Sequence, residues 1–298
     1  MAAISFYLAL PFLILLSILP FRLLFIVSDM LFPVVYYLVA YRKKVVLNNL
    51  RNAFPEKSEQ EIKSISRKFY RHFTDVTLEI LKMRTVSPRK LRNRIHYGNP
   101  ELLQKYYKDN RGVMGMSAHY NNWEWTSACA EWGPHHAIVI YKPLNNKYFD
   151  RFVKKARERH GVEMVPMRDT LRRVIEDQRK GKLVLYGLIS DQSPVWQDIQ
   201  YWTTFLNQYT GMLTGAEKLS VRTGMPAVYY SMRKIKRGRY IIDLIPLSED
   251  HTNIGSNEIT EKFVRVMEEK IRENPEYWLW THRRWKHTPR KLAEMENS

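Results

Sequence analysis

The chain has 298 residues, enough for one large domain or two small ones, and 48 lysines and arginines against 30 acidic residues give it a formal charge of +18. So large a charge calls for an anionic partner, which could be nucleic acid, an anionic membrane surface, or an acidic substrate or carrier protein. The single cysteine, Cys129, excludes an internal disulfide framework and a multi-cysteine zinc site, and the nine scattered histidines lack standard metal spacing, so no metal is expected.

The N-terminal segment is almost free of charge. From Met1 to Tyr41 only Arg22 and Asp29 are charged. The uncharged run over residues 1–21 is about long enough to cross a bilayer core of ~30 Å, and a second run over residues 31–41 suits an interfacial or re-entrant helix. The basic cluster that follows, residues 42–44, fits the positive-inside pattern. We therefore predict a retained membrane anchor over residues 1–41, with residues 42–298 on the cytoplasmic side of the inner membrane.

A cleaved signal peptide is the competing interpretation of this segment. Cleavage requires a basic stretch before the apolar run and small residues at the cleavage site. Residues 1–21 have neither feature. The sequence therefore favours the retained anchor.

An amphipathic helix is predicted after Pro55. Ser58 and Glu61 form a capping-box pattern at its start. Apolar residues then follow at steps of three and four as far as Ile80, which gives one apolar stripe. His72 and Asp75 on this helix are expected to be surface polar residues. Residues 42–95 are accordingly predicted to be a helical part of the domain.

From Arg111 onward, short β-rich runs alternate with helical patterns. This alternation predicts an α/β fold with a central sheet over residues 96–298. The expected strands are 112–118, 137–141, 161–165, 182–189, 226–232 and 240–246, and the expected helices are 122–132, 147–160, 169–180, 211–223 and 259–274.

The segment from His119 to Glu124 is the most informative motif. A histidine can take up a proton near neutral pH, and a carboxylate can orient it and stabilise its charged form. On one continuous α-helix, five residues turn through roughly 140°, so the two side chains would point apart. They can meet if His119 ends a strand and Glu124 lies in the first turn of the following helix. Asn121 and Glu124 also match a capping box, in which Glu124 would only cap that helix.

Five blocks, in order along the chain, form a recognisable set. They are His119–Glu124, Tyr141–Asn146, Asp191–Gln192, the stretch from Phe205 through Thr210 and Gly211 to Leu219, and Pro275–Lys286. This set resembles the motifs of one enzyme family, the late (lauroyl/myristoyl) acyltransferases of lipid A biosynthesis. That family lies within the wider group of glycerolipid and lysophospholipid acyltransferases with H-x4-D/E motifs. The sequence departs from the family pattern at Asn121, at Ser193, and at Leu206 and Asn207.

The resemblance implies a glycerolipid-acyltransferase-like α/β sandwich with an N-terminal transmembrane or membrane-anchoring helix. It implies transfer of a fatty acyl group from acyl carrier protein, or from coenzyme A, to a hydroxyl of a lipid A precursor. His119 would be the general base, and Glu124 would orient it and stabilise its imidazolium. The expected partners are acyl carrier protein, a lipid acceptor and the inner membrane, but no nucleic acid. No cofactor is expected beyond the acyl co-substrate.

Further residues are expected to bind substrate. Arg157 and Arg168 occupy basic positions shared with the family and could hold acceptor phosphates, or they could be surface charges. Asp191 and Gln192 follow a strand and could bind acceptor hydroxyls or cap a loop. Gly211, with Thr210, could bring main-chain amides to an oxyanion, or it could only permit a turn. The Arg283–Arg284 pair adds two cations that could serve the acceptor.

Other functions stay open from sequence alone. Within the same chemistry, the acceptor could be a lysophospholipid or an aminolipid. Outside enzymes, the charge and the anchor suit a protein that only binds anionic membranes. Trp278 to Lys286 alternate rings with cations and could stack on nucleic-acid bases, although no nucleic-acid-binding motif accompanies them.

Overall fold

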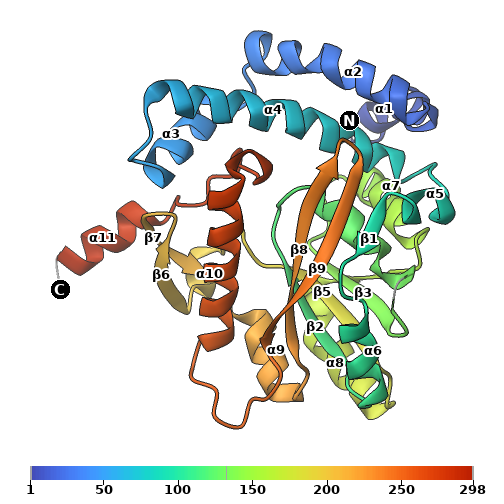
Figure 1. The fold of residues 1–298 in the computed structure, drawn as a ribbon, viewed down its shortest axis with the longest axis vertical. Coiled ribbons are helices and arrows are strands. Elements are labelled where there is room, and N and C mark those ends of the chain that lie inside the picture. Colours follow the sequence, from blue (N-terminus) through green and yellow to red (C-terminus); the bar gives the residue numbers. More distant parts are fainter. Residues whose placement is uncertain (1, 132, 297–298) are drawn as a thin grey trace.

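A seven-stranded sheet organises the molecule (Figure 1). The computed structural model describes residues 2–131 and 133–296. The strands of the sheet are β1 (Ile95–Tyr97), β2 (Val113–Ser117), β3 (His136–Tyr141), β4 (Glu163–Pro166), β5 (Val184–Ile189), β8 (Ala227–Lys236) and β9 (Arg239–Ser248). The strand order is β1-β9-β8-β2-β5-β3-β4. The five strands from β8 to β4 in this order run parallel, whereas β9 is antiparallel to β8 and β1 is parallel to β9.

Helices cover the sheet, and a separate antiparallel hairpin lies beside it. The hairpin consists of β6 (Tyr201–Phe205) and β7 (Gln208–Met212). The α-helices are α1 (Ala2–Ile18), α2 (Phe21–Pro33), α3 (Lys43–Ala53), α4 (Glu59–Lys82), α5 (Pro88–Arg92), α6 (Glu101–Lys108), α7 (Lys147–Glu158), α8 (Thr170–Arg179), α9 (Gly215–Thr223), α10 (Glu258–Glu273) and α11 (Thr288–Glu296). A π-helical turn, η1 (Val34–Leu38), extends α2, and 3-10 turns are η2 (Trp123–Glu131), η3 (Met167–Asp169), η4 (Trp196–Asp198) and η5 (Pro275–Tyr277).

The α/β class predicted from sequence is confirmed, and all six expected strands are present with shifted ends. Two expected helices differ. Residues 123–131 form the 3-10 turn η2 rather than an α-helix, and Trp132 lies outside the described residues. Residues 211–212 still belong to β7, so the expected helix 211–223 begins only at Gly215. Strand β1 and the β6–β7 hairpin were not expected.

The N-terminal apolar segment forms two helices that pack on α4 (Figure 1). Pro20 separates α1 from α2, so the described part of the expected run 1–21 is not one helix; Met1 lies outside the described residues. By length and composition, the helical stretch from Phe21 to Leu38 could cross a membrane. Phe32 and Tyr36 belong to the same hydrophobic core as Phe69 of α4.

Helix α4 packs against α1, α2, α3, η1 and η5, and its start confirms the predicted capping box. The Ser58 amide donates to Glu61 Oε2 at 2.8 Å, and the Glu61 amide donates to the Ser58 hydroxyl at 3.3 Å. The expectation that His72 and Asp75 lie at the surface is wrong, since both are buried. They are buried because α2 and the β8–β9 hairpin close over this part of α4.

Glu79 of α4 is fully buried beneath the His119 segment. Its Oε2 accepts hydrogen bonds from Asn122 Nδ2 at 2.6 Å and from the Tyr240 hydroxyl at 2.8 Å. Its carbonyl accepts from Trp125 Nε1 at 3.1 Å. Burial outweighs these hydrogen bonds and raises the pKa of Glu79 to about 7.

This raised pKa makes stability depend on pH. A glutamate that binds its proton more tightly when folded contributes stability that is full below its unfolded pKa and is lost as pH rises through about 7. Glu79→Gln keeps an accepting oxygen and cannot ionise. We expect the variant to match the native protein near pH 5 and to exceed it at pH 8 by roughly 1–3 kcal/mol.

Thermal unfolding of the detergent-solubilised protein across this pH range measures the effect. Glu56→Gln, at an exposed position before α4, is the control, and it should leave the pH profile unchanged. Equal stability of native protein and Glu79→Gln at both pH values would contradict the expectation.

Candidate active site

The ends of two neighbouring parallel strands bring the predicted site residues together. Strand β2 ends at Ser117, which is in register with Ile189 at the end of β5. His119 follows the first strand and Asp191 follows the second. Because the carboxyl ends of parallel strands meet at one edge of the sheet, side chains from distant parts of the chain converge there.

Asp191 is the carboxylate that contacts His119. Its Oδ1 lies 2.7 Å from His119 Nδ1, and its Oδ2 accepts from the His119 amide at 2.9 Å and from Trp278 Nε1 at 2.8 Å. The carboxylate is buried, which alone would raise its pKa. The charge and hydrogen bonds of His119, with the indole N–H, hold the pKa below its usual value. Asp191 is therefore an ionised group that fixes both the main chain and the ring of His119.

The other ring nitrogen of His119 faces Gln192. Gln192 Nε2 lies 3.1 Å from His119 Nε2. With the Nδ1 proton directed at Asp191, His119 Nε2 carries a lone pair, and the Gln192 amide donates to it; the tautomer is assigned from this network. His119 Nε2 is therefore a basic nitrogen that already accepts one hydrogen bond, from Gln192.

Glu124 lies in the same region but pairs with Arg157 instead of His119. Arg157 Nε and Nη2 donate to the two Glu124 oxygens at 2.7 Å and 2.6 Å. Only 19% of the Arg157 side chain is exposed. Burial opposes its charge, but Glu124 outweighs it, so the pKa of Arg157 is raised. The predicted contact between Glu124 and His119 is thus not formed, because α7 supplies a fixed cation to Glu124 while β5 supplies Asp191 to the histidine.

A cavity of about 1100 Å³ opens beside His119. Its inner wall is one face of the sheet, where Gly115, Gly187 and Val139 are neighbours in register on β2, β5 and β3. A Cβ on Gly115 would lie 2.7 Å from the Tyr230 ring, so this glycine makes room for the ring. A Cβ on Gly187 would meet only ordinary contacts at 3.8 Å. Gly187 therefore widens the cavity along an apolar wall.

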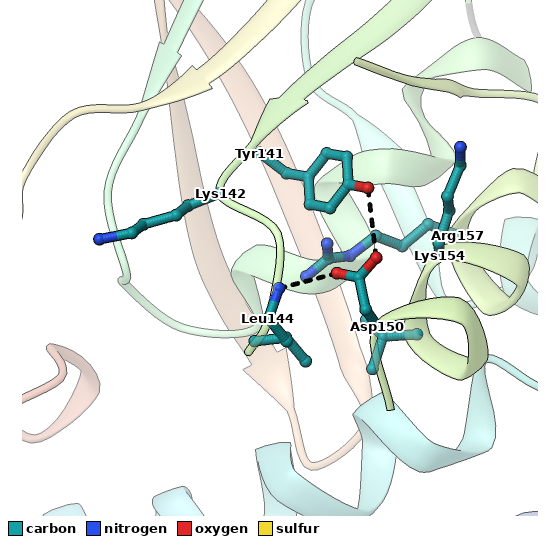
Figure 2. A pocket seen from close by; sticks show the side chains of 7 residues that line it. Tyr141, Lys142, Leu144, Asp150, Lys154 and Arg157 are labelled. Carbon is teal, nitrogen blue, oxygen red and sulfur yellow. Dashed lines mark hydrogen bonds between the residues drawn. The ribbon is translucent and has the colours of Figure 1, made fainter. Parts of the chain in front are cut away.

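Cations lie at the outer part of the cavity. Lys142 follows β3 in the predicted Tyr141–Asn146 block and is exposed. Asp150 holds this block, since it accepts from the Leu144 amide at 2.8 Å and from the Tyr141 hydroxyl at 3.4 Å. Figure 2 shows both bonds, and Lys142 pointing away from them. Arg168 also lines the cavity, with 85% of its side chain exposed.

Two predicted binding residues have structural tasks elsewhere. The Gly211 carbonyl accepts from Arg284 Nη2 at 2.8 Å, and a Cβ on Gly211 would lie 2.4 Å from Ile199 Cγ2. Arg284 is fully buried and also donates to the Thr210 hydroxyl at 2.8 Å. This pair joins the C-terminal segment to the β6–β7 hairpin. Burial and these bonds commit Arg284 to the hairpin and not to an acceptor phosphate, whereas the expected role of Gly211 in binding an oxyanion stays a prediction.

The sequence did not identify Trp278 and His282 as parts of the site. The C-terminal block packs on the His119 segment: the Leu279 amide donates to the His119 carbonyl at 3.1 Å, and Trp278 bonds to Asp191. His282 Nε2 accepts from the Ser193 amide at 3.1 Å, and burial lowers the pKa of His282 to about 4. The resemblance of Pro275–Lys286 to the family motif was the signal, but it did not indicate that Trp278 and His282 would contact the residues that follow β5.

Comparison with known proteins shows the family of this chain. A family model described as bacterial lipid A biosynthesis acyltransferase matches residues 2–287. The chain is similar to the lipid A biosynthesis lauroyltransferase of Escherichia coli K12, at 25% identity over 283 residues, covering 89% of this chain and 90% of the relative. It is also similar to the lipid A biosynthesis palmitoleoyltransferase of the same organism, at 22% identity over 253 residues, covering 83% and 80%. The chain therefore belongs to the bacterial lipid A biosynthesis acyltransferases and is an acyltransferase.

Proposed function

We propose that this enzyme transfers a fatty acyl chain from an acyl-carrier-protein thioester to a hydroxyl of a lipid A precursor, with His119 as the general base. One observation carries the proposal: His119, whose Nε2 contacts Gln192, lines a large cavity with an apolar inner wall and cations at its outer part. An acyl chain suits the wall, and a phosphorylated sugar suits the cations.

The proposed step needs no protein nucleophile. The acceptor hydroxyl displaces the Gln192 amide from His119 Nε2 and gives its proton to that nitrogen. Its oxygen forms the new bond to the thioester carbonyl carbon. When the carbon–sulfur bond breaks, the thiolate leaves and takes the proton from His119. Asp191 holds the ring and stabilises the imidazolium, which is the role first expected of Glu124.

Glu124 acts through Arg157 in this proposal. A buried pair of opposite charges is strongly destabilised when one partner is removed, because the other charge is left without compensation. The pair therefore fixes η2 against α7 and shapes the cavity wall beside His119.

The net charge and the apolar N-terminal helices support the proposed acyl donor and membrane location. The net charge of +18 suits an acidic carrier protein and an anionic membrane surface. We propose that the protein resides at the inner membrane with its active site on the cytoplasmic side, held by the apolar N-terminal helices.

The direct test is acyl transfer from acyl carrier protein to a phosphorylated lipid A precursor, run beside a lysophospholipid at equal concentration. Acyl-coenzyme A replaces acyl carrier protein in a parallel arm. Preference for the phosphorylated disaccharide supports the proposal. Preference for the lysophospholipid would reject the acceptor while leaving acyl transfer standing.

We expect Asp191→Asn to lower kcat by ~10²–10⁴-fold, as His119→Ala should, because the ring loses its orienting charge. Steady-state kinetics measures the rate, and a normal rate for Asp191→Asn would refute its proposed role.

Glu124→Ala should lower activity together with Tm, since Arg157 becomes an unpaired buried charge. The double variant lacking Glu124 and Arg157 should therefore be less unstable than the sum of the single changes. Steady-state kinetics and thermal unfolding measure these effects.

Gly187→Leu should shorten the acyl chain that the enzyme prefers. The added side chain would fill the cavity along the sheet, and each methylene it displaces forfeits roughly 0.8 kcal/mol of burial. kcat/KM for long acyl donors should fall, while that for short donors is retained. Gly215→Ala, at an open position outside the cavity lining, is the control. An unchanged chain-length profile for Gly187→Leu would place the acyl chain elsewhere.

Lys142→Ala and Arg168→Ala should each weaken acceptor use by ~1.5–3 kcal/mol per lost charge-assisted contact. The effect should appear in the KM for the acceptor and leave the KM for the donor nearly unchanged. Arg172→Ala is the matched control, because Arg172 is a similarly exposed cation on α8 outside the cavity lining. If Arg172→Ala has the same effect, the cations act only through the overall charge.

A further inference from the structure

The helical stretch from Phe21 to Leu38 is apolar on two opposite faces. One face is buried against the body at Leu24, Ser28, Phe32 and Tyr36, four residues apart. A helix that is apolar all round is normally enclosed by apolar surroundings. Here the second face is open, and its large apolar side chains are Leu23, Ile26, Met30, Val34, Tyr37 and Leu38.

Helix α1 shows the same division. Near its start, the Phe6 ring packs against Phe149 and Phe152 of α7, at centroid distances of 5.0 Å and 6.2 Å. At its end, the Ser17 carbonyl accepts from Lys82 Nζ at 2.7 Å. Contacts at both ends hold the helix along the body. Exposed apolar side chains recur along the helix at Ile4, Leu8, Phe12 and Leu15.

Polar contacts fix α2 to the body in its middle. The Ser28 hydroxyl donates to Asp75 Oδ1 at 2.7 Å, and the Asp75 side chain is only 4% exposed. Arg237, at the turn of the β8–β9 hairpin, pairs with Asp29 at 2.8 Å and with Asp75 at 2.6 Å. A helix drawn away into lipid would leave Asp75 without Ser28 and would carry Asp29 from its partner, which is costly in hydrocarbon.

Charge favours a bilayer as the occupant of the open faces. Residues 1–53 contain five cations and one acid, Asp29, and that acid is paired with Arg237. Arg22 and the exposed members of the cluster at residues 42–44 flank the apolar faces. This combination suits a helix lying at a surface of anionic headgroups.

We propose that α1 and the α2–η1 stretch lie in the plane of the membrane, within one leaflet, and that neither crosses the bilayer. The inner faces of both helices belong to the protein core, and their outer faces meet lipid. The N-terminus and the catalytic body are then on the same side. The inference rests on the proposed membrane location, and it replaces the spanning anchor that the sequence suggested.

Depth measurements on the full-length protein test this inference. Nitroxide labels replace Ile4 or Leu15 on α1, or Leu23 or Leu38 on the α2–η1 stretch, through single cysteines, in a chain whose Cys129 is changed to Ala. The labelled protein is reconstituted in vesicles of zwitterionic and anionic phospholipid, and label depth is read from power saturation by oxygen and a water-soluble nickel complex. The exposed Lys180→Cys position on the body is the control, and its label should report water.

In-plane helices predict nearly equal, shallow depths for the four labels. A spanning helix, rising about 1.5 Å per residue, would change depth by ~16 Å between positions 4 and 15, or by ~22 Å between positions 23 and 38. That gradient would overturn the in-plane arrangement while leaving the proposed function standing. Failure of the unlabelled full-length protein to bind the vesicles would overturn the membrane location, and the inference with it.

Discussion

The buried carboxylate of Asp191 is the interaction on which the active site depends. It accepts hydrogen bonds from the His119 main chain, the His119 ring and the Trp278 indole, so it joins the ends of β2 and β5 to the C-terminal block. A buried charge is tolerated only where donors surround it, and these three donors meet that condition. The same contacts that stabilise the charge also orient the base.

Two further acids hold the segment that follows His119. The Glu79 carboxylate accepts from Asn122, and its main-chain carbonyl accepts from Trp125. The Glu124 carboxylate accepts from Arg157. Each acid comes from a different part of the fold. Burial raises the pKa of Glu79, whereas the donors around Asp191 lower its pKa and Glu124 pairs with a cation. The positions of His119 and its neighbours are therefore set by long-range packing of α4, α7 and β5.

Local pattern was enough to predict the strands and the capping box of α4, because alternating apolar runs and cap residues act over a few positions. It also placed His119 and Asp191 at strand ends, and the family resemblance marked both. The sequence could not tell which acid reaches the histidine, because spacing favours Glu124 while strand order decides for Asp191.

The errors at Asp75 and Arg284 have a related origin. A polar residue on an amphipathic helix is normally solvated, yet α2 and the β8–β9 hairpin cover Asp75. Gly211 and Arg284 lie in blocks that resemble the family motifs, yet they bond to one another far from the base in sequence. Membership of a motif did not reveal whether a residue contacts substrate or supports the residues that contact it.

The packing of α1 against α7, and of α2 against α4, also limits how the enzyme can move. A body on a flexible tether would tumble and present its active site in every direction. Here α1 and α2 pack on the body that holds the cavity, so attachment of their apolar faces to a surface would fix the direction in which the cavity opens. A lipid substrate diffusing within that surface would then meet the active site in a constant orientation, which reduces the rotational search needed for productive encounter.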